Sequence, residues 1–122
     1  MNTQDPRSDR ASGRDGEAAK AERRGRRLRL SCRLFFFGED DFEGEATVLD
    51  LSTNGCQVTS LTKVQAGMVF RLSLFLLDQQ SPLRIDEALV RWVSGEQFGL
   101  EFTGIRPAQR ERIRSIIMKA KL

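Results

Sequence analysis

The chain has 122 residues, of which 39% are hydrophobic, and this is enough for one domain with its own core. The formal net charge is only +3, which excludes a large, uniformly basic surface. The sequence contains no histidine, the commonest general base and metal ligand, so composition argues against an enzyme and against a metal site.

Residues 1–21 form a polar, charged segment rich in Gly, Ala and Ser, in which Met1 carries the only large apolar side chain. Such a segment buries too little surface to offset the entropy of ordering it, which predicts a disordered tail. We therefore expect the folded domain to span residues 22–122.

Two cysteines, Cys32 and Cys56, lie in separate predicted strands. The sequence shows neither a signal peptide nor an apolar stretch long enough to span a bilayer. We therefore expect a cytoplasmic protein in which both thiols are reduced core residues.

Six segments with strand character follow the tail in chain order. From Leu28 to Phe37 apolar residues alternate with polar or basic ones, which is the period of a strand with one buried face. The acidic stretch Gly38–Glu45 is predicted to be a hairpin loop. Its four acids between Glu39 and Glu43 do not match the spacing of a calcium loop, so we predict no metal site. The remaining predicted strands are Ala46–Leu51, Cys56–Ser60, Met68–Leu77, Leu83–Val93 and Phe98–Phe102.

The pattern changes from a period of two to helical spacing after Pro107, a residue well suited to the first turn of a helix. Ile113, Ile116 and Ile117 recur at helical spacing, while arginines and a lysine occupy the other faces. The predicted fold class is therefore all-β: a six-stranded antiparallel β-barrel with a C-terminal α-helix.

A run of seven basic residues lies between Lys20 and Arg33, with Glu22 as the only acid among them. Within this run, Arg23 and Arg27 make an Arg-x-x-x-Arg pair. The planar guanidinium group can bind phosphate through two hydrogen bonds, stack on a base, or contact the O6/N7 edge of guanine. The alternative interpretation is a solvated basic arm without a ligand.

A second polar motif, Asp50-Leu-Ser52-Thr-Asn-Gly55, lies where the predicted second strand turns into the third. Asp50 can accept two N–H bonds of the kind that the Watson–Crick edge of guanine offers, and Ser52 can bond to a base or a phosphate. Gly55 permits a positive φ and close approach of the backbone. The alternative is that Asp50 and Ser52 only stabilise the turn through bonds to the backbone.

The two motifs together, in this order and spacing, resemble the PilZ domain family. Val90, Trp92, Gly99 and Phe102 add further agreement, since PilZ domains often have an apolar-x-Trp strand followed by a hairpin and a Gly-x-x-Phe strand. The resemblance covers about residues 22–120 and implies a six-stranded barrel with a C-terminal helix. It also implies that the chain binds the bacterial second messenger cyclic di-GMP.

Carried over residue by residue, the family's motifs place ligand contacts at five positions. Arg23 and Arg27 would bind phosphates and stack on guanine or contact its edge. Asp50 and Ser52 would hold guanine edges, and Gly55 would let the backbone approach the ligand. Other arginines lie directly beside the pair, so the sequence does not decide which two of them bind the ligand. Apart from the ligand we expect no cofactor. Further candidate contacts are Arg24, Arg26, Asn54, Trp92 and Gly99.

These assignments predict a small single-domain receptor that binds cyclic di-GMP and switches a protein–protein contact. One alternative is a PilZ-type interaction module that works without the ligand and docks through exposed apolar positions such as Phe35, Phe37 or Phe75. Another is a nucleic-acid-binding β-barrel, which explains the arginines but not Asp50, whose carboxylate would repel a phosphate backbone. The sequence contains no catalytic constellation, and we expect no enzymatic activity.

Overall fold

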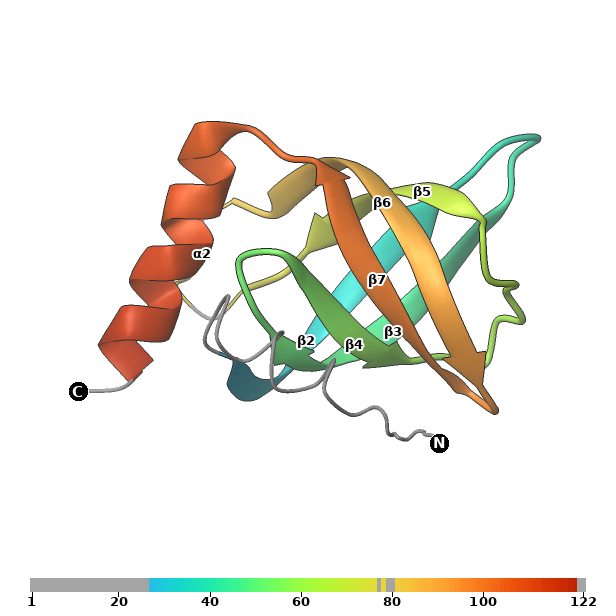
Figure 1. Cartoon of the computed structure of the whole chain (residues 1–122), viewed down its shortest axis with the longest axis horizontal. Coiled ribbons are helices and arrows are strands. Elements are labelled where there is room, and N and C mark those ends of the chain that lie inside the picture. Colours follow the sequence, from blue (N-terminus) through green and yellow to red (C-terminus); the bar gives the residue numbers. More distant parts are fainter. Residues whose placement is uncertain (1–26, 77, 79–80, 121–122) are drawn as a thin grey trace.

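The computed structural model describes residues 27–76, 78 and 81–120 of the chain. The predicted disordered tail, residues 1–21, lies outside this part. Elements carry the labels of Figure 1. They are β2 (Leu28–Phe37), β3 (Glu43–Leu51), β4 (Gly55–Thr59), β5 (Val69–Leu74), β6 (Leu83–Ser94), β7 (Gln97–Gly104) and α2 (Pro107–Ala120).

The six strands close into one antiparallel barrel (Figure 1). Neighbouring strands follow the order β2-β3-β4-β7-β6-β5, and β5 pairs back to β2, with Leu34 opposite Leu74. Closure gives each of these strands a neighbour on both sides, which removes most of the free edge on which unwanted pairing could begin. The predicted fold class, a six-stranded antiparallel barrel with a C-terminal helix, is confirmed.

The alternation predicted for β2 fills the interior of the barrel. Leu34 and Phe36 are fully buried, while the residues between and beside them are at least partly exposed. The ring of Phe36 packs against those of Phe42, Phe70 and Phe98, with ring centroids 4.8 to 6.2 Å apart. Because each such pair contributes roughly 0.5–1.5 kcal/mol beyond its buried area, this cluster favours the observed register of β2.

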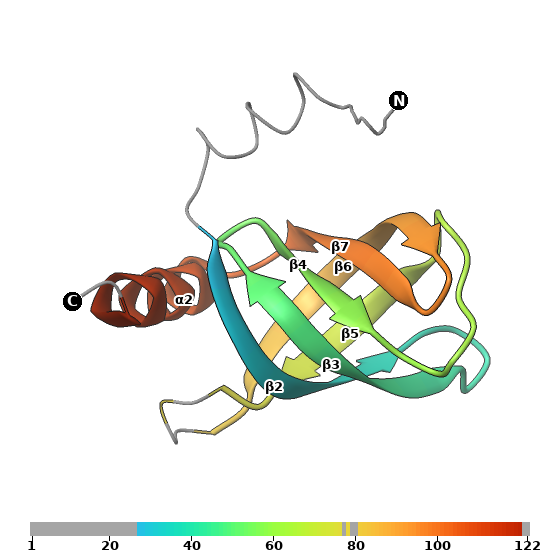
Figure 2. The same ribbon diagram turned by 90° about the horizontal axis from the view of Figure 1, so that it is seen from below.

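Helix α2 lies at one end of the barrel, beside the turn that joins β3 to β4 (Figures 1 and 2). Ile113 and Ile117 are buried in the same core as the strands, so the predicted apolar face of the helix covers this end. The β2–β3 turn and the β6–β7 hairpin lie at the other end of the barrel. In the part of the chain that the structure describes, no helix is long and apolar enough to cross a membrane.

Strand β3 begins at Glu43, whereas the sequence predicted a start at Ala46. Glu43 and Glu45 are exposed on the outer surface, and Gly44 packs beneath the ring of Phe36, where a Cβ atom would collide with it. A strand tolerates carboxylates where its side chains face solvent. The acidic composition therefore led us to predict a loop where the chain continues the strand. The other strand boundaries differ from the predicted ones by at most three residues.

Cys32 and Cys56 are free and buried, as the sequence predicted. Burial raises the pKa of the Cys32 thiol to about 11. Burial also raises the pKa of Cys56, and the nearby charge of Asp50 adds to this effect. Both thiols are therefore protonated at neutral pH, which makes them poor nucleophiles.

Candidate functional site

A pocket of about 470 Å³ opens on the outer surface of strands β4, β7 and β6. Most of the predicted ligand-binding residues come together around it, from the start of β2, the β3–β4 turn, β6 and β7. Those that line the pocket are Arg27, Ser52, Asn54, Gly55, Trp92 and Gly99. Arg23, Arg24 and Arg26 lie outside the described residues, so the first half of the arginine pair stays a prediction.

Asp50 joins the pocket through Arg27. The Nη1 atom of Arg27 donates to Oδ1 of Asp50 over 2.6 Å, and the two side chains are 38% and 18% exposed. Pairing of β2 with β3 brings about this contact. Arg29 lies opposite Asp50, so Arg27, just before β2, is close enough for its side chain to reach Asp50. Asp50 does not itself line the pocket but holds Arg27 at its edge. The two sequence motifs are therefore in direct contact.

Ser52 is only 5% exposed, and its hydroxyl group belongs to the β3–β4 turn. The Oγ atom donates to the carbonyl of Gly55 (3.3 Å) and accepts the N–H of Asn54 (3.2 Å). The backbone N–H of Ser52 donates to the same Gly55 carbonyl over 2.9 Å. The structure thus shows the turn-stabilising role of Ser52, while its contact with a guanine edge stays a prediction.

Two glycines are required around the pocket because other atoms pack closely against them. Gly55 does not have a positive φ. A Cβ atom on Gly55 would instead collide with the backbone carbonyl of Leu100 in β7. A Cβ atom on Gly99 would collide with the indole ring of Trp92. The close backbone approach at Gly55 is therefore an approach between strands β4 and β7.

Trp92 lies on the outer surface of the barrel and is 37% exposed. A register shift between Val90 and Trp92 interrupts the alternation in β6, so Val90 is buried while Trp92 faces outward. Similar shifts occur in β2 and β3, next to Arg29 and Asp50. Irregularities of this kind re-aim side chains and are common beside functional sites.

Sequence reasoning missed three polar residues in the lining of the pocket: Gln57, Arg91 and Glu101. Gln57 lies opposite Gly99 and Glu101 lies opposite Gly55, so cross-strand pairing brings them to the predicted glycines. Arg91 pairs with Glu101 over 3.4 Å. Gln57 and Glu101 each lie two positions after one of the two predicted glycines and so point to the same side of the strand. This alternation, read together with the strand pairing, would have indicated both residues.

Arg110 of α2 holds the β3–β4 turn from outside the barrel. Its Nη1 atom donates to Oδ1 of Asn54 (2.8 Å) and to the backbone carbonyl of Thr53 (3.1 Å). The backbone carbonyl of Asn54 accepts a further bond from the N–H of Phe102 in β7, over 2.8 Å. Helix and barrel therefore both fix the turn, through contacts that no local sequence pattern indicates.

The pocket combines two guanidinium groups with an exposed indole ring and the side-chain amides of Asn54 and Gln57. Guanidinium groups bind phosphate or the acceptor edge of guanine, and the face of an indole ring stacks on a base. Among the described residues, no group of three or more His, Cys, Asp or Glu side chains could hold a metal ion. The arrangement suits a ligand that has both anionic groups and planar aromatic groups.

The model of the PilZ domain family matches residues 19–119, and the chain therefore belongs to this family. The resemblance drawn from the two sequence motifs is confirmed. No match by sequence was found among the curated proteins.

Solved structures that share the fold include the Bacillus subtilis inhibitor of motility MotI/DgrA, at 19% identity and a TM-score of 0.67. The match covers 80% of this chain and 50% of that protein. The PilZ domain of Escherichia coli YcgR, determined with c-di-GMP, has 17% identity, a TM-score of 0.66 and coverages of 79% and 88%. The PilZ domain of CeSA from a cellulose synthesizing bacterium has 13% identity and a TM-score of 0.61. That match covers 79% of this chain and 98% of the CeSA domain. This chain thus spans about half the length of the Bacillus protein, and these similarities show the fold.

Proposed function

We propose that the chain binds cyclic di-GMP in the pocket on β4, β7 and β6 and acts as a receptor for this second messenger. Membership of the PilZ domain family supports the proposal, as does the solved complex of the YcgR PilZ domain with the same ligand. The observation that carries it is the direct contact of the two motifs through Arg27 and Asp50 at the edge of the pocket.

On binding, the contact between Arg27 and Asp50 would be replaced by contacts of each side chain with the ligand. The guanidinium group would turn to a phosphate or to the O6/N7 edge of guanine, and the carboxylate would accept N–H bonds from the Watson–Crick edge. An ion pair as exposed as this one contributes about 0–1 kcal/mol, whereas micromolar binding corresponds to about −8 kcal/mol. Loss of the ion pair is therefore a small term beside the free energy of binding.

One face of the Trp92 ring packs closely against Gly99, and its exposed face would stack on one guanine base. Arg23, the other half of the arginine pair, would bind a phosphate or guanine of the same nucleotide. Because the sequence predicts a disordered tail directly before this segment, binding would order the chain between the tail and β2 and change its shape. In our proposal this change switches a contact with a partner protein in the cytoplasm, without any enzymatic step.

The pocket is less suited to nucleic acid. Both guanidinium groups in its lining have carboxylate partners, since Arg27 pairs with Asp50 and Arg91 with Glu101. Proteins that bind a single strand without sequence preference use a continuous basic groove instead. A small ligand with guanine edges can use the donors and the acceptors of this pocket together.

A calorimetric titration with cyclic di-GMP tests the proposal, and cyclic di-AMP is the matched control because it keeps the phosphates and changes the base. We expect saturable binding of cyclic di-GMP at micromolar concentration and much weaker binding of cyclic di-AMP. Adenine lacks the O6 acceptor and the N–H pair that Arg27 and Asp50 would recognise. The proposal fails if cyclic di-GMP gives no saturable binding, or if both nucleotides bind equally.

A further inference from the structure

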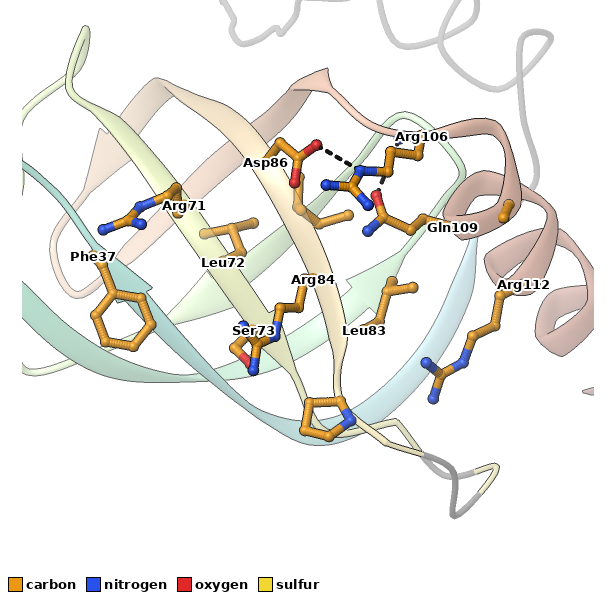
Figure 3. A pocket seen from close by; sticks show the side chains of 13 residues that line it. Phe37, Arg71, Leu72, Ser73, Leu83, Arg84, Asp86, Arg106, Gln109 and Arg112 are labelled. Carbon is orange, nitrogen blue, oxygen red and sulfur yellow. Dashed lines mark hydrogen bonds and ion pairs between the residues drawn. The ribbon is translucent and has the colours of Figure 1, made fainter.

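Another pocket, of about 730 Å³, shares no lining residue with the ligand pocket, and Figure 3 shows the side chains that line it. It extends from the outer surface of β5 and β6 to the first turns of α2. In the barrel order β2-β3-β4-β7-β6-β5, strand β5 stands opposite β4, where the ligand pocket begins. We call this surface the arginine face, because its lining includes Arg71, Arg84, Arg106 and Arg112.

The four arginines differ in their partners. Arg106 and Arg112 each bind a carboxylate, at distances of 3.1 and 2.9 Å. The side chains of Arg71 and Arg84, which project from the neighbouring strands β5 and β6, have no ion pair or hydrogen bond with any residue that the structure describes. The arginine face therefore carries two uncompensated positive charges on adjacent strands (Figure 3).

An exposed aromatic side chain borders these charges. Phe37 lies directly opposite Arg71 in the β2–β5 pairing and is 36% exposed. Aromatic residues and arginine are the types enriched in protein–protein interfaces and in their energetic hot spots. The arginine face and its aromatic border thus have the composition of a protein-binding surface.

We propose that the arginine face docks an acidic segment of a partner protein. Arg71 and Arg84 bind carboxylates of the segment, each through the two-pronged geometry that a guanidinium group offers. An apolar side chain of the segment packs on Phe37. The inference rests on the proposed function only in naming the contact that the receptor would switch, because the face itself is separate from the ligand pocket.

Charge complementarity favours an acidic protein segment over nucleic acid. The carboxylate of Asp86 lies within the arginine face and is about half exposed, so a continuous phosphate backbone would meet a like charge there. A peptide can place its carboxylates at Arg71 and Arg84 alone and present apolar groups elsewhere. The exposed edge of Phe37 then gains contact area that a phosphate backbone does not supply.

The test uses a short fluorescein-labelled peptide that mixes Glu with Leu and Phe, and follows its anisotropy upon titration with the full chain. Matched probes replace Glu by Gln, replace Leu and Phe by Ser, or substitute single-stranded DNA of equal charge. The Arg71→Glu/Arg84→Glu variant removes the two free arginines. The Lys63→Glu/Lys119→Glu variant makes the same change of net charge at exposed positions outside the arginine face.

We expect the acidic, apolar peptide to bind the wild-type chain more tightly than any matched probe does. Arg71→Glu/Arg84→Glu should weaken this binding about tenfold or more, and the lysine variant should retain it. The proposal is overturned if the peptide does not bind, if both variants lose it equally, or if DNA binds more tightly. It is also overturned if light scattering shows a self-association of the chain that Arg71→Glu/Arg84→Glu disperses.

Failure of this inference is distinguishable from failure of the proposed function. Cyclic di-GMP should bind Arg71→Glu/Arg84→Glu as it binds the wild-type chain, because the two arginines lie away from the ligand pocket. Specific peptide binding by a chain that does not bind the nucleotide would leave the arginine face standing and overturn only the receptor proposal. Nucleotide binding without peptide binding would leave the receptor proposal standing and overturn only the proposed role of the arginine face.

Discussion

Arg27 and Asp50 are central to ligand recognition in our proposal but contribute little to the stability of the fold. Their ion pair is close to the surface, with side chains 38% and 18% exposed, so it stabilises the folded state by at most about 1 kcal/mol. Buried side chains such as Phe36 contribute far more. Recognition and stability can therefore be separated by mutation.

Asp50→Ala and Arg27→Ala should each abolish binding of cyclic di-GMP, because each removes one of the two groups that would hold guanine or phosphate. The free energy of unfolding should fall by no more than about 1 kcal/mol. Calorimetry measures the first effect and thermal unfolding the second. Arg84→Ala, on the arginine face, is the control and should bind normally. Wild-type binding by both pocket variants would show that the site is assigned wrongly.

The two glycines of the pocket should respond differently to the same substitution. Gly55→Ala forces a Cβ atom against the backbone carbonyl of Leu100 and should cost about 1–3 kcal/mol of stability, as other overpacked sites do. Gly99→Ala meets the side chain of Trp92, which can move, so it should cost less and shift the tryptophan emission. Urea unfolding followed by fluorescence measures both effects. Equal stability of the two variants would contradict the observed packing.

The β3–β4 turn is the element at which the fold and the site meet. Ser52 closes the turn from within, Arg110 binds it from helix α2, and Phe102 binds it from β7. A ligand bound in the pocket, as we propose, would therefore touch an element that is in direct contact with the helix. The turn is held before any ligand arrives, which lowers the entropy lost on binding.

Arg110→Ala should loosen this turn without unfolding the barrel. We expect faster hydrogen exchange at the Asn54 amide and a several-fold weaker affinity for cyclic di-GMP, consistent with the loss of bonds worth about 0.5–1.5 kcal/mol each. Arg114→Ala is the matched control, since among the described residues Arg114 pairs only with Glu111, three positions before it in the helix. If the Asn54 amide exchanges at the wild-type rate in Arg110→Ala, the helix does not support the turn.

Elements with a regular local pattern could be predicted from the sequence, and irregular ones could not. The alternation of β2 and the change of pattern at Pro107 located a strand and a helix correctly. The register shift that turns Trp92 outward has no local signal, because it depends on how β6 pairs with β7. The bond from Arg110 to Asn54 joins positions 56 residues apart, and only the closed barrel brings them together.

At the scale of the whole molecule, the barrel separates two surfaces of different chemistry. The proposed ligand pocket lies around β4 and β7, and the arginine face lies around β5. Several residues of the sequence motifs come together around the first, because arginine, aspartate and glycine stand close together along the chain or at recognisable spacing. The second emerged only from strand pairing, which places Phe37 of β2 opposite Arg71 of β5.

The buried thiols should make the barrel less stable in alkali. The pKa of Cys32 is raised from 9.0 to about 11 in the folded state, so the folded chain holds this proton more tightly than the unfolded chain. Stability should be unaffected well below pH 9 and should fall as the pH rises from about 9 to 11, by up to about 1.4 kcal/mol per pH unit for each thiol.

Urea unfolding at a series of pH values measures this dependence, and a Cys32→Ala/Cys56→Ala variant is its control. The variant should lose the part of the slope that comes from the thiols, although its stability at neutral pH is lower because two core side chains are smaller. An identical alkaline slope in both proteins would show that the thiols are not responsible.

Fluorescence of Trp92 tests the central claim most directly, because it reports from the proposed site itself. Trp92 is the only tryptophan, the chain has no tyrosine, and the indole ring lines the ligand pocket. Cyclic di-GMP should produce a saturable change in emission of the wild-type chain, with the midpoint found by calorimetry, and no change in Asp50→Ala. Saturable heat without any change in emission would place the ligand elsewhere and contradict the proposed site.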